Sequence, residues 1–219
     1  MNKPATTNVP TCSQSMTADN KKAVLEMKSK NIQAIIIIVA LFSALGSMAL
    51  AAQDRYTLKS PNGISYSEFK GYEAWQAIAP SQPADAGGCG SSPAPGCIKV
   101  IVGNPAMINA YKDGFPANGK PVPDGAVLAK IEWQKKTKRP PESAYEVTVP
   151  GTYSEVTFML KDSKRFPKTD GWGYAKFRYD AASDTFKTFD DPEFATTCHA
   201  CHTAFVKARD FVFTDYPKR

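Results

Sequence analysis

Histidine is scarce in this sequence. Only two of the 219 residues are histidines, His199 and His202, and both lie near the C-terminal end. A site that needs several imidazole groups is therefore excluded. Glycine shows no repeating period, so a collagen-like fibrous chain is excluded as well.

The bulk composition is that of a globular protein. Hydrophobic residues make up 42% of the chain and charged residues 22%, which is too apolar for a disordered chain. A length near 200 predicts one domain, or at most two small ones. The formal net charge of +6 is a mild basic excess, which indicates nucleic-acid binding only where it clusters on one face, and we expect no nucleic-acid partner.

Residues 1–51 are predicted to be an N-terminal extension plus a signal peptide. The run 34–50 is apolar and nearly uncharged, lysines precede it, and Ala49-Leu50-Ala51 is a small-x-small cleavage pattern. We expect translation to start at Met27, cleavage near Ala51 and a periplasmic location for the domain 52–219. Because the run is about long enough to span a bilayer, an uncleaved membrane anchor is the alternative.

The rest of the chain predicts an α+β fold with a mostly antiparallel β-sheet and a few short helices. Val127, Ala129 and Ile131 alternate with Leu128, Lys130 and Glu132. This two-residue period is typical of a β-strand. Short connectors between such segments favour antiparallel pairing. Strands are expected at 98–102, 127–134, 145–149, 155–160 and 173–179, and helices at 67–78, 105–111 and 197–209. The charge run 135–139 is interpreted as a solvated loop.

Cys198-His199-Ala200-Cys201-His202 is a C-x-x-C-H motif, the attachment signature of haem c. Two thiols three residues apart on a helical turn can each bond one vinyl group of a porphyrin, and the following histidine then reaches the iron. The motif predicts one covalently attached haem c near the C-terminus, with His202 as axial iron ligand. A structural disulfide, a redox pair and half of a zinc site are the alternatives. The zinc site lacks further ligands, and the redox pair lacks its usual βαβ setting.

The scarcity of histidine also bears on the sixth coordination position. No histidine or methionine follows His202, and the only methionines of the predicted domain, Met107 and Met159, are interpreted as core residues. His199 is badly placed to reach the far side of a haem and is expected to be exposed or hydrogen-bonded. We therefore predict a five-coordinate iron, which suits gas binding or catalysis better than simple electron transfer.

Two further cysteines, Cys89 and Cys97, bracket a segment rich in glycine, proline and serine. This segment can close on itself, and an exported protein meets an oxidising environment. We predict a loop-closing disulfide between them.

At this point the sequence resembles the cytochrome P460 family, which includes the cytochromes c′-beta. The similarity is carried by four blocks: 124–130 (DGAVLAK), 161–167 (KDSKRFP), 171–175 (GWGYA), and the haem motif with the residues 207–214 (KARDFVFT). The resemblance implies a largely antiparallel β fold, often dimeric, with a five-coordinate haem c.

The resemblance also suggests two site residues. Lys130 matches the lysine that cytochromes P460 bond to the porphyrin, and the strand pattern points it away from the apolar face; a solvated lysine is the alternative. Glu193, in the segment just before the haem motif, would be a distal base for hydroxylamine. Phe194 would instead wall off a gas pocket.

The functional prediction is a periplasmic c-type haem protein that oxidises hydroxylamine to nitrous oxide or nitric oxide. The alternative is a non-enzymatic cytochrome of the c′-beta type that binds or scavenges nitric oxide, and a third reading is a monohaem electron carrier. The expected partners are a small nitrogenous ligand, a soluble electron-accepting cytochrome and a second copy of the chain.

Overall fold

The computed structural model describes residues 54–83 and 96–217, which belong to one compact unit. The predicted signal peptide and Cys89 lie outside the described residues. Among the helices that are described, none has the length and apolar character needed to cross a membrane.

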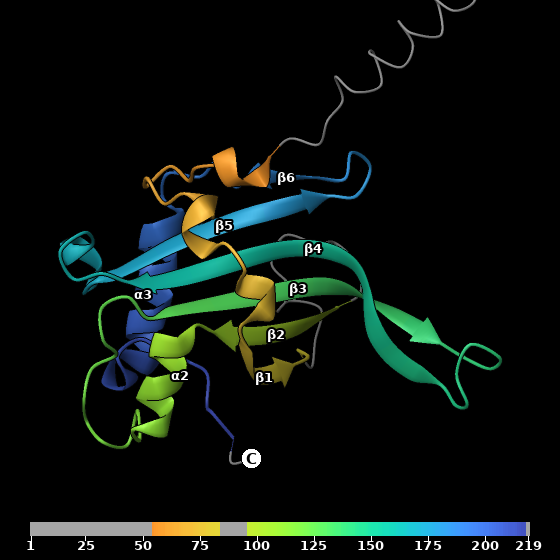
Figure 1. Cartoon of the computed structure of the whole chain (residues 1–219), viewed down its shortest axis with the longest axis horizontal. Helices are drawn as coiled ribbons and strands as arrows, with labels where there is room; N and C mark the ends of the chain where they lie inside the picture. The colour runs from red at the N-terminus through yellow and green to blue at the C-terminus, as the bar shows by residue number, and fades with distance from the viewer. Residues whose placement is uncertain (1–53, 84–95, 218–219) are drawn as a thin grey trace, which may run out of the picture. The chain divides into compact units, whose positions relative to one another are not determined.

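The centre of the fold is a six-stranded antiparallel sheet in which each strand pairs with its neighbour in sequence (Figure 1). This confirms the predicted mostly antiparallel α+β class. The strands are β1 (Gln76–Ser81), β2 (Cys97–Gly103), β3 (Val127–Lys138), β4 (Val147–Lys161), β5 (Trp172–Asp180) and β6 (Thr185–Thr188). Neither β1 nor β6 was expected from the sequence.

Strands β3 and β4 are longer than predicted and run out beyond the other strands as a hairpin (Figure 1). The charge run 135–139 was expected to be a loop, but β3 continues through it to Lys138. The predicted strands 145–149 and 155–160 form the single strand β4. The pairing with β3 shifts register twice near Trp133, and Pro150 then lies opposite Lys135 within the continuing ladder. A register irregularity thus lets the ladder continue through a residue that usually ends strands.

The predicted helix 67–78 is wrong. The segment contains two 3₁₀ helices, η2 (Tyr66–Phe69) and η3 (Tyr72–Ala74), and then enters β1. Gly71 separates the two helices at a positive φ of 84°. The three-residue spacing of the aromatic side chains, taken as an α-helical face, is the period of a 3₁₀ helix.

The two α-helices in the described part of the chain are close to their predicted positions. Helix α2 (Pro105–Lys112) begins as expected after Asn104, whose side chain accepts a hydrogen bond of 3.0 Å from the Met107 amide. Helix α3 (Phe194–Val206) begins three residues earlier than predicted and continues into the 3₁₀ helix η6 (Lys207–Arg209). Two further 3₁₀ helices are η1 (Arg55–Thr57) and η5 (Pro167–Thr169).

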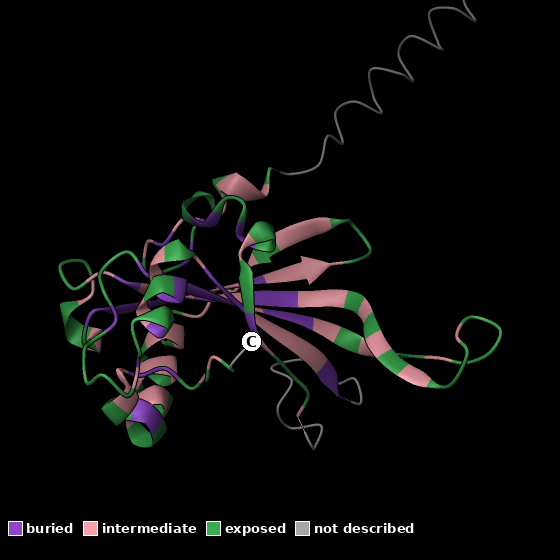
Figure 2. Ribbon diagram, turned by 60° about the horizontal axis from the view of Figure 1, so that its bottom comes forward, coloured by how far each residue is buried: buried purple, intermediate pink, exposed green. Residues whose placement is uncertain are grey.

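The sheet has two covered faces. On one, the 3₁₀ helices of residues 55–74 pack Tyr66 and Phe69 against Ala129 and Phe158. On the other, which we call the helical face, α2, α3 and the C-terminal segment pack against Leu128 and Tyr174. Figure 2 shows buried residues in the middle of the sheet and exposed ones along the β3–β4 hairpin. Since side chains alternate along a strand, Lys130 shares the helical face with Leu128.

Candidate haem site

The haem motif lies in α3, on the helical face of the sheet. Cys198 and His202 are one helical turn apart, and both line a cavity of about 320 Å³ between α3, the sheet and the C-terminal segment. Cys201 is exposed on the same helix. The cavity wall is mostly apolar and is formed by Ile101, Leu128, Lys130, Thr157, Met159, Tyr174, Lys176, Phe194, Cys198, His202, Phe213 and Thr214.

His202 is held in the form that binds iron. Its Nδ1 lies 2.6 Å from the Phe211 carbonyl oxygen, and because a carbonyl only accepts, Nδ1 must carry the proton. Burial lowers the pKa of His202, although the hydrogen bond to Phe211 opposes this shift. The imidazole is therefore neutral near pH 7, with the lone pair on Nε2, as an axial ligand requires.

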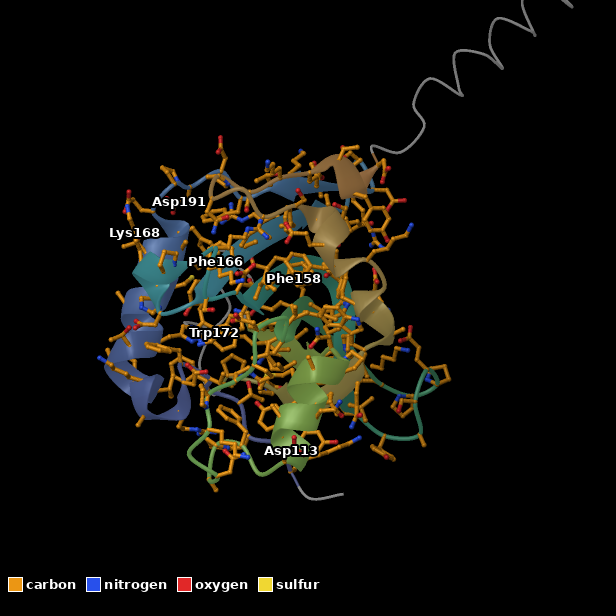
Figure 3. All side chains as sticks on the ribbon, turned by 60° about the vertical axis from the view of Figure 1, so that its left-hand side comes forward. Asp113, Phe158, Phe166, Lys168, Trp172 and Asp191 are labelled. Atoms are coloured by element: carbon orange, nitrogen blue, oxygen red, sulfur yellow. The ribbon has the colours of Figure 1, made fainter. Side chains whose placement is uncertain are left out.

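The Phe211 carbonyl is fixed by its neighbour Asp210. The Asp210 carboxylate pairs with the buried Lys161 ammonium at 2.9 Å and accepts a hydrogen bond of 2.8 Å from the Val122 amide. Trp172 Nε1 lies 3.4 Å from the same carboxylate, and Figure 3 shows Trp172 in the interior of the molecule. The turn that carries Phe211 is thus anchored to the ends of β4 and β5.

The two motif cysteines are free thiols, so they do not form the structural disulfide considered as an alternative. Burial raises the pKa of Cys198 to about 11, which keeps the thiol protonated at neutral pH. In residues 54–83 and 96–217 there is no group of three or more His, Cys, Asp and Glu side chains that could hold a metal ion. The zinc alternative therefore has no ligand set in this part of the chain.

His199 is a hydrogen-bonded side chain, as predicted, and does not line the cavity. Its Nε2 lies 2.9 Å from Asp170 Oδ2, and its Nδ1 lies 3.4 Å from the Tyr174 hydroxyl. These contacts tie α3 to the start of β5, which sets the position of the haem motif over the sheet.

Lys130 lies in the cavity wall, and about one third of its side chain is exposed. Its Nζ is 3.4 Å from Glu132 Oε1 on the same strand. Lys130 is paired in register with Thr157, and Thr157 with Lys176, so two lysines flank a threonine across three strands. The Lys130 side chain points away from the apolar face of β3, as the alternation predicts, and toward the cavity.

Glu193 and Met159 differ from their sequence interpretations. Glu193 is exposed at the N-terminal end of α3 and does not line the cavity, whereas its neighbour Phe194 does. Met159 was interpreted as a core residue, but its half-buried side chain lines the cavity. Met107 is fully buried, as expected.

The family model of cytochrome P460 matches residues 69–214, about two thirds of the sequence. This chain belongs to the cytochrome P460 family. No curated protein matches the sequence. Membership implies a haem cofactor, and the residues fit one: the cavity has a neutral imidazole, the Cys198 thiol and a mostly apolar wall, and a second free thiol, Cys201, is exposed on the same helix.

Other cavity residues of this member of the family were not found from the sequence. Lys176 lies two residues after Tyr174 on β5, so the alternation of the strand could have predicted that both side chains lie on the same face of the sheet. Phe213 and Thr214 come from a segment without periodicity, and only the fold shows that they reach the cavity. Cys97 is buried at the start of β2; because Cys89 is outside the described residues, their disulfide stays a prediction.

Proposed function

We propose that this member of the cytochrome P460 family is a periplasmic c-type haem protein that oxidises hydroxylamine to nitrous oxide or nitric oxide. The observation that carries the proposal is that Cys198, His202 and Lys130 line a single cavity. Cys198 and Cys201 would hold one haem, and His202 Nε2 would bind its iron. Lys130, which matches the cross-linking lysine of the family, would lie at the porphyrin edge.

When bound, the haem would supply an iron that accepts electrons from a nitrogenous ligand. Besides His202, Met159 is the one methionine or histidine side chain in the described cavity wall, so an open iron position requires that the Met159 thioether does not bind the iron. The apolar side chains around the cavity would exclude water from a small ligand. The fixed carbonyl of Phe211 would keep His202 oriented throughout turnover.

The proposal is tested by hydroxylamine-dependent reduction of an artificial electron acceptor by the purified holoprotein. We expect activity in the wild type and its loss in Lys130→Ala. Lys176→Ala is the matched control, because Lys176 also lines the cavity but does not match the family's cross-linking position. A wild-type protein that carries its full complement of haem but shows no such activity would refute the proposal that it oxidises hydroxylamine.

A second candidate, nitric-oxide binding without catalysis, is favoured by a specific observation. Phe194 lines the cavity, while the carboxylate of Glu193 lies outside it. A cavity walled by a phenyl ring and lacking that base suits an uncharged gas better than a ligand that must lose protons. Tight nitric-oxide binding by a protein without hydroxylamine activity would support this candidate.

Export, the electron-accepting cytochrome and a homodimer complete the proposal. The signal-like segment 34–51 supports export, and haem c is attached outside the cytoplasm. Cell fractionation with intact-mass measurement tests export: a periplasmic protein that begins near residue 52 supports it, and a membrane-bound chain that retains the segment contradicts it. Light scattering of the holoprotein tests the dimer.

A further inference from the structure

Two glutamates lie buried side by side on the helical face, two residues farther along the strands than the pair of Lys130 and Thr157. Glu132 on β3 and Glu155 on β4 are direct partners in the strand register. Only 2% of Glu132 and 5% of Glu155 is exposed. Such burial is costly for two negative charges unless they are neutralised or paired.

Four cationic side chains surround the carboxyl pair. Lys130 Nζ lies 3.4 Å from Glu132, and Lys176 Nζ lies 3.1 Å from Glu155. The other two are Lys99 on β2, at 3.2 Å from Glu132, and Arg178 on β5, at 3.8 Å from Glu155. Since Lys130 and Lys176 also line the cavity, they connect the pair electrostatically with the haem site.

The geometry of the pair provides a place where one shared proton can bind. Both oxygens of Glu132 and Oε1 of Glu155 are buried, and no donor among the described residues makes a well-directed hydrogen bond to them. The two carboxyl groups belong to direct cross-strand partners, and because two carboxylates can only accept, one of them must be protonated before they can bond to each other. One proton between them satisfies an oxygen on each side and removes one buried charge.

The environments of the two groups push their pKa values in opposite directions. Burial raises the pKa of Glu155, and the hydrogen bond with Glu132 raises it further, against the opposing charge of Lys176. Burial acts in the same sense on Glu132, but the hydrogen bond from Glu155 and the charges of Lys130 and Lys99 outweigh it and lower its pKa. Neighbouring carboxyls pushed apart in this way titrate as one unit.

We propose that Glu132 and Glu155 bind a proton in step with the oxidation state of the haem iron. One-electron reduction by an external reductant makes the iron site one unit more negative, and Glu155 compensates by taking one proton from solvent. Oxidation returns the electron to an acceptor and the proton to solvent. The proposal rests on the haem of the proposed function, but it does not depend on hydroxylamine oxidation.

The direct test is the midpoint potential of the haem as a function of pH. In the wild type we expect the potential to fall as pH rises, by up to about 59 mV per pH unit where one proton accompanies one electron. In Glu155→Gln the midpoint potential should no longer depend on pH where the wild-type potential falls. The reason is that the amide donates permanently to Glu132 and cannot titrate. Glu142→Gln, at an exposed position on the hairpin, is the matched control and should keep the slope.

Infrared difference spectra of the wild type provide a test that needs no variant. Reduced-minus-oxidised spectra should show the carbonyl band of a protonated carboxyl group that shifts in heavy water. The absence of such a band, or a slope unchanged in Glu155→Gln, would overturn the proposal. Because both readouts are independent of turnover, they separate this inference from the hydroxylamine assay.

Discussion

At the scale of single residues, the proposed function depends on which side chains can reach the iron. His202 is fixed by its hydrogen bond to Phe211, and its half-buried imidazole is neutral near pH 7. The sequence alone predicted His202 from the motif, since the spacing has a chemical cause. It could not place Met159, because an apolar side chain in a strand fits a core and a cavity wall equally well.

Replacing Met159 by leucine tests the open coordination position. If the iron has five ligands, Met159→Leu retains the cavity's apolar volume and leaves the absorption and electron paramagnetic resonance spectra of the ferric protein unchanged. A change from a low-spin to a high-spin spectrum would instead identify Met159 as the sixth ligand. That outcome would support the electron-carrier reading.

At the scale of elements, the turn after α3 is held by a buried ion pair. Asp210→Ala would leave the Lys161 ammonium buried without its partner and remove the acceptor of the Val122 amide. Breaking a buried pair in this way lowers the free energy of unfolding by about 3–5 kcal/mol. Denaturant unfolding measures the loss.

The matched control is Asp215→Ala. Asp215 also forms an ion pair, in this case with Arg209, but 80% of the Asp215 side chain is exposed. Exposed pairs contribute about 0–1 kcal/mol, so this variant should unfold close to the wild type. Equal losses in the two variants would refute the anchoring role of Asp210.

The β3–β4 hairpin is a second element whose role can be tested. Its residues beyond Trp133 and Tyr153 are absent from the described cavity wall. We therefore expect that replacing residues 136–149 with an Asn-Gly turn, next to the paired positions Lys135 and Pro150, leaves the haem absorption spectrum unchanged. A shifted spectrum would show that the hairpin supports the site.

The elements also show where sequence reasoning stops. Helix α2 was predicted closely, because Asn104-Pro105 is a local start signal. The segment 67–78 was not, since Gly71 and the sheet pairing of β1 decide its structure and neither is visible in the spacing of its aromatics. Strand β4 was split at Pro150 because a proline favours a strand end unless the ladder bulges around it.

At the scale of the whole molecule, the sheet orders the site in rows. Leu128, Met159 and Tyr174 form one row under α3, and Lys130, Thr157 and Lys176 form the next. The buried Glu132–Glu155 pair lies in the row beyond. The period of each strand could be predicted from the sequence, but the register that joins Lys130 to the carboxyl pair depends on long-range pairing.

A peptide mass map of the holoprotein shows directly how the haem is bound. After denaturation and digestion, we expect that the peptide with Cys198 and Cys201 carries one haem, and that this haem is also joined to a peptide containing Lys130. A haem peptide without Lys130 would support the nitric-oxide binding alternative. Unmodified Cys198 and Cys201 in the haem-loaded protein would contradict the account.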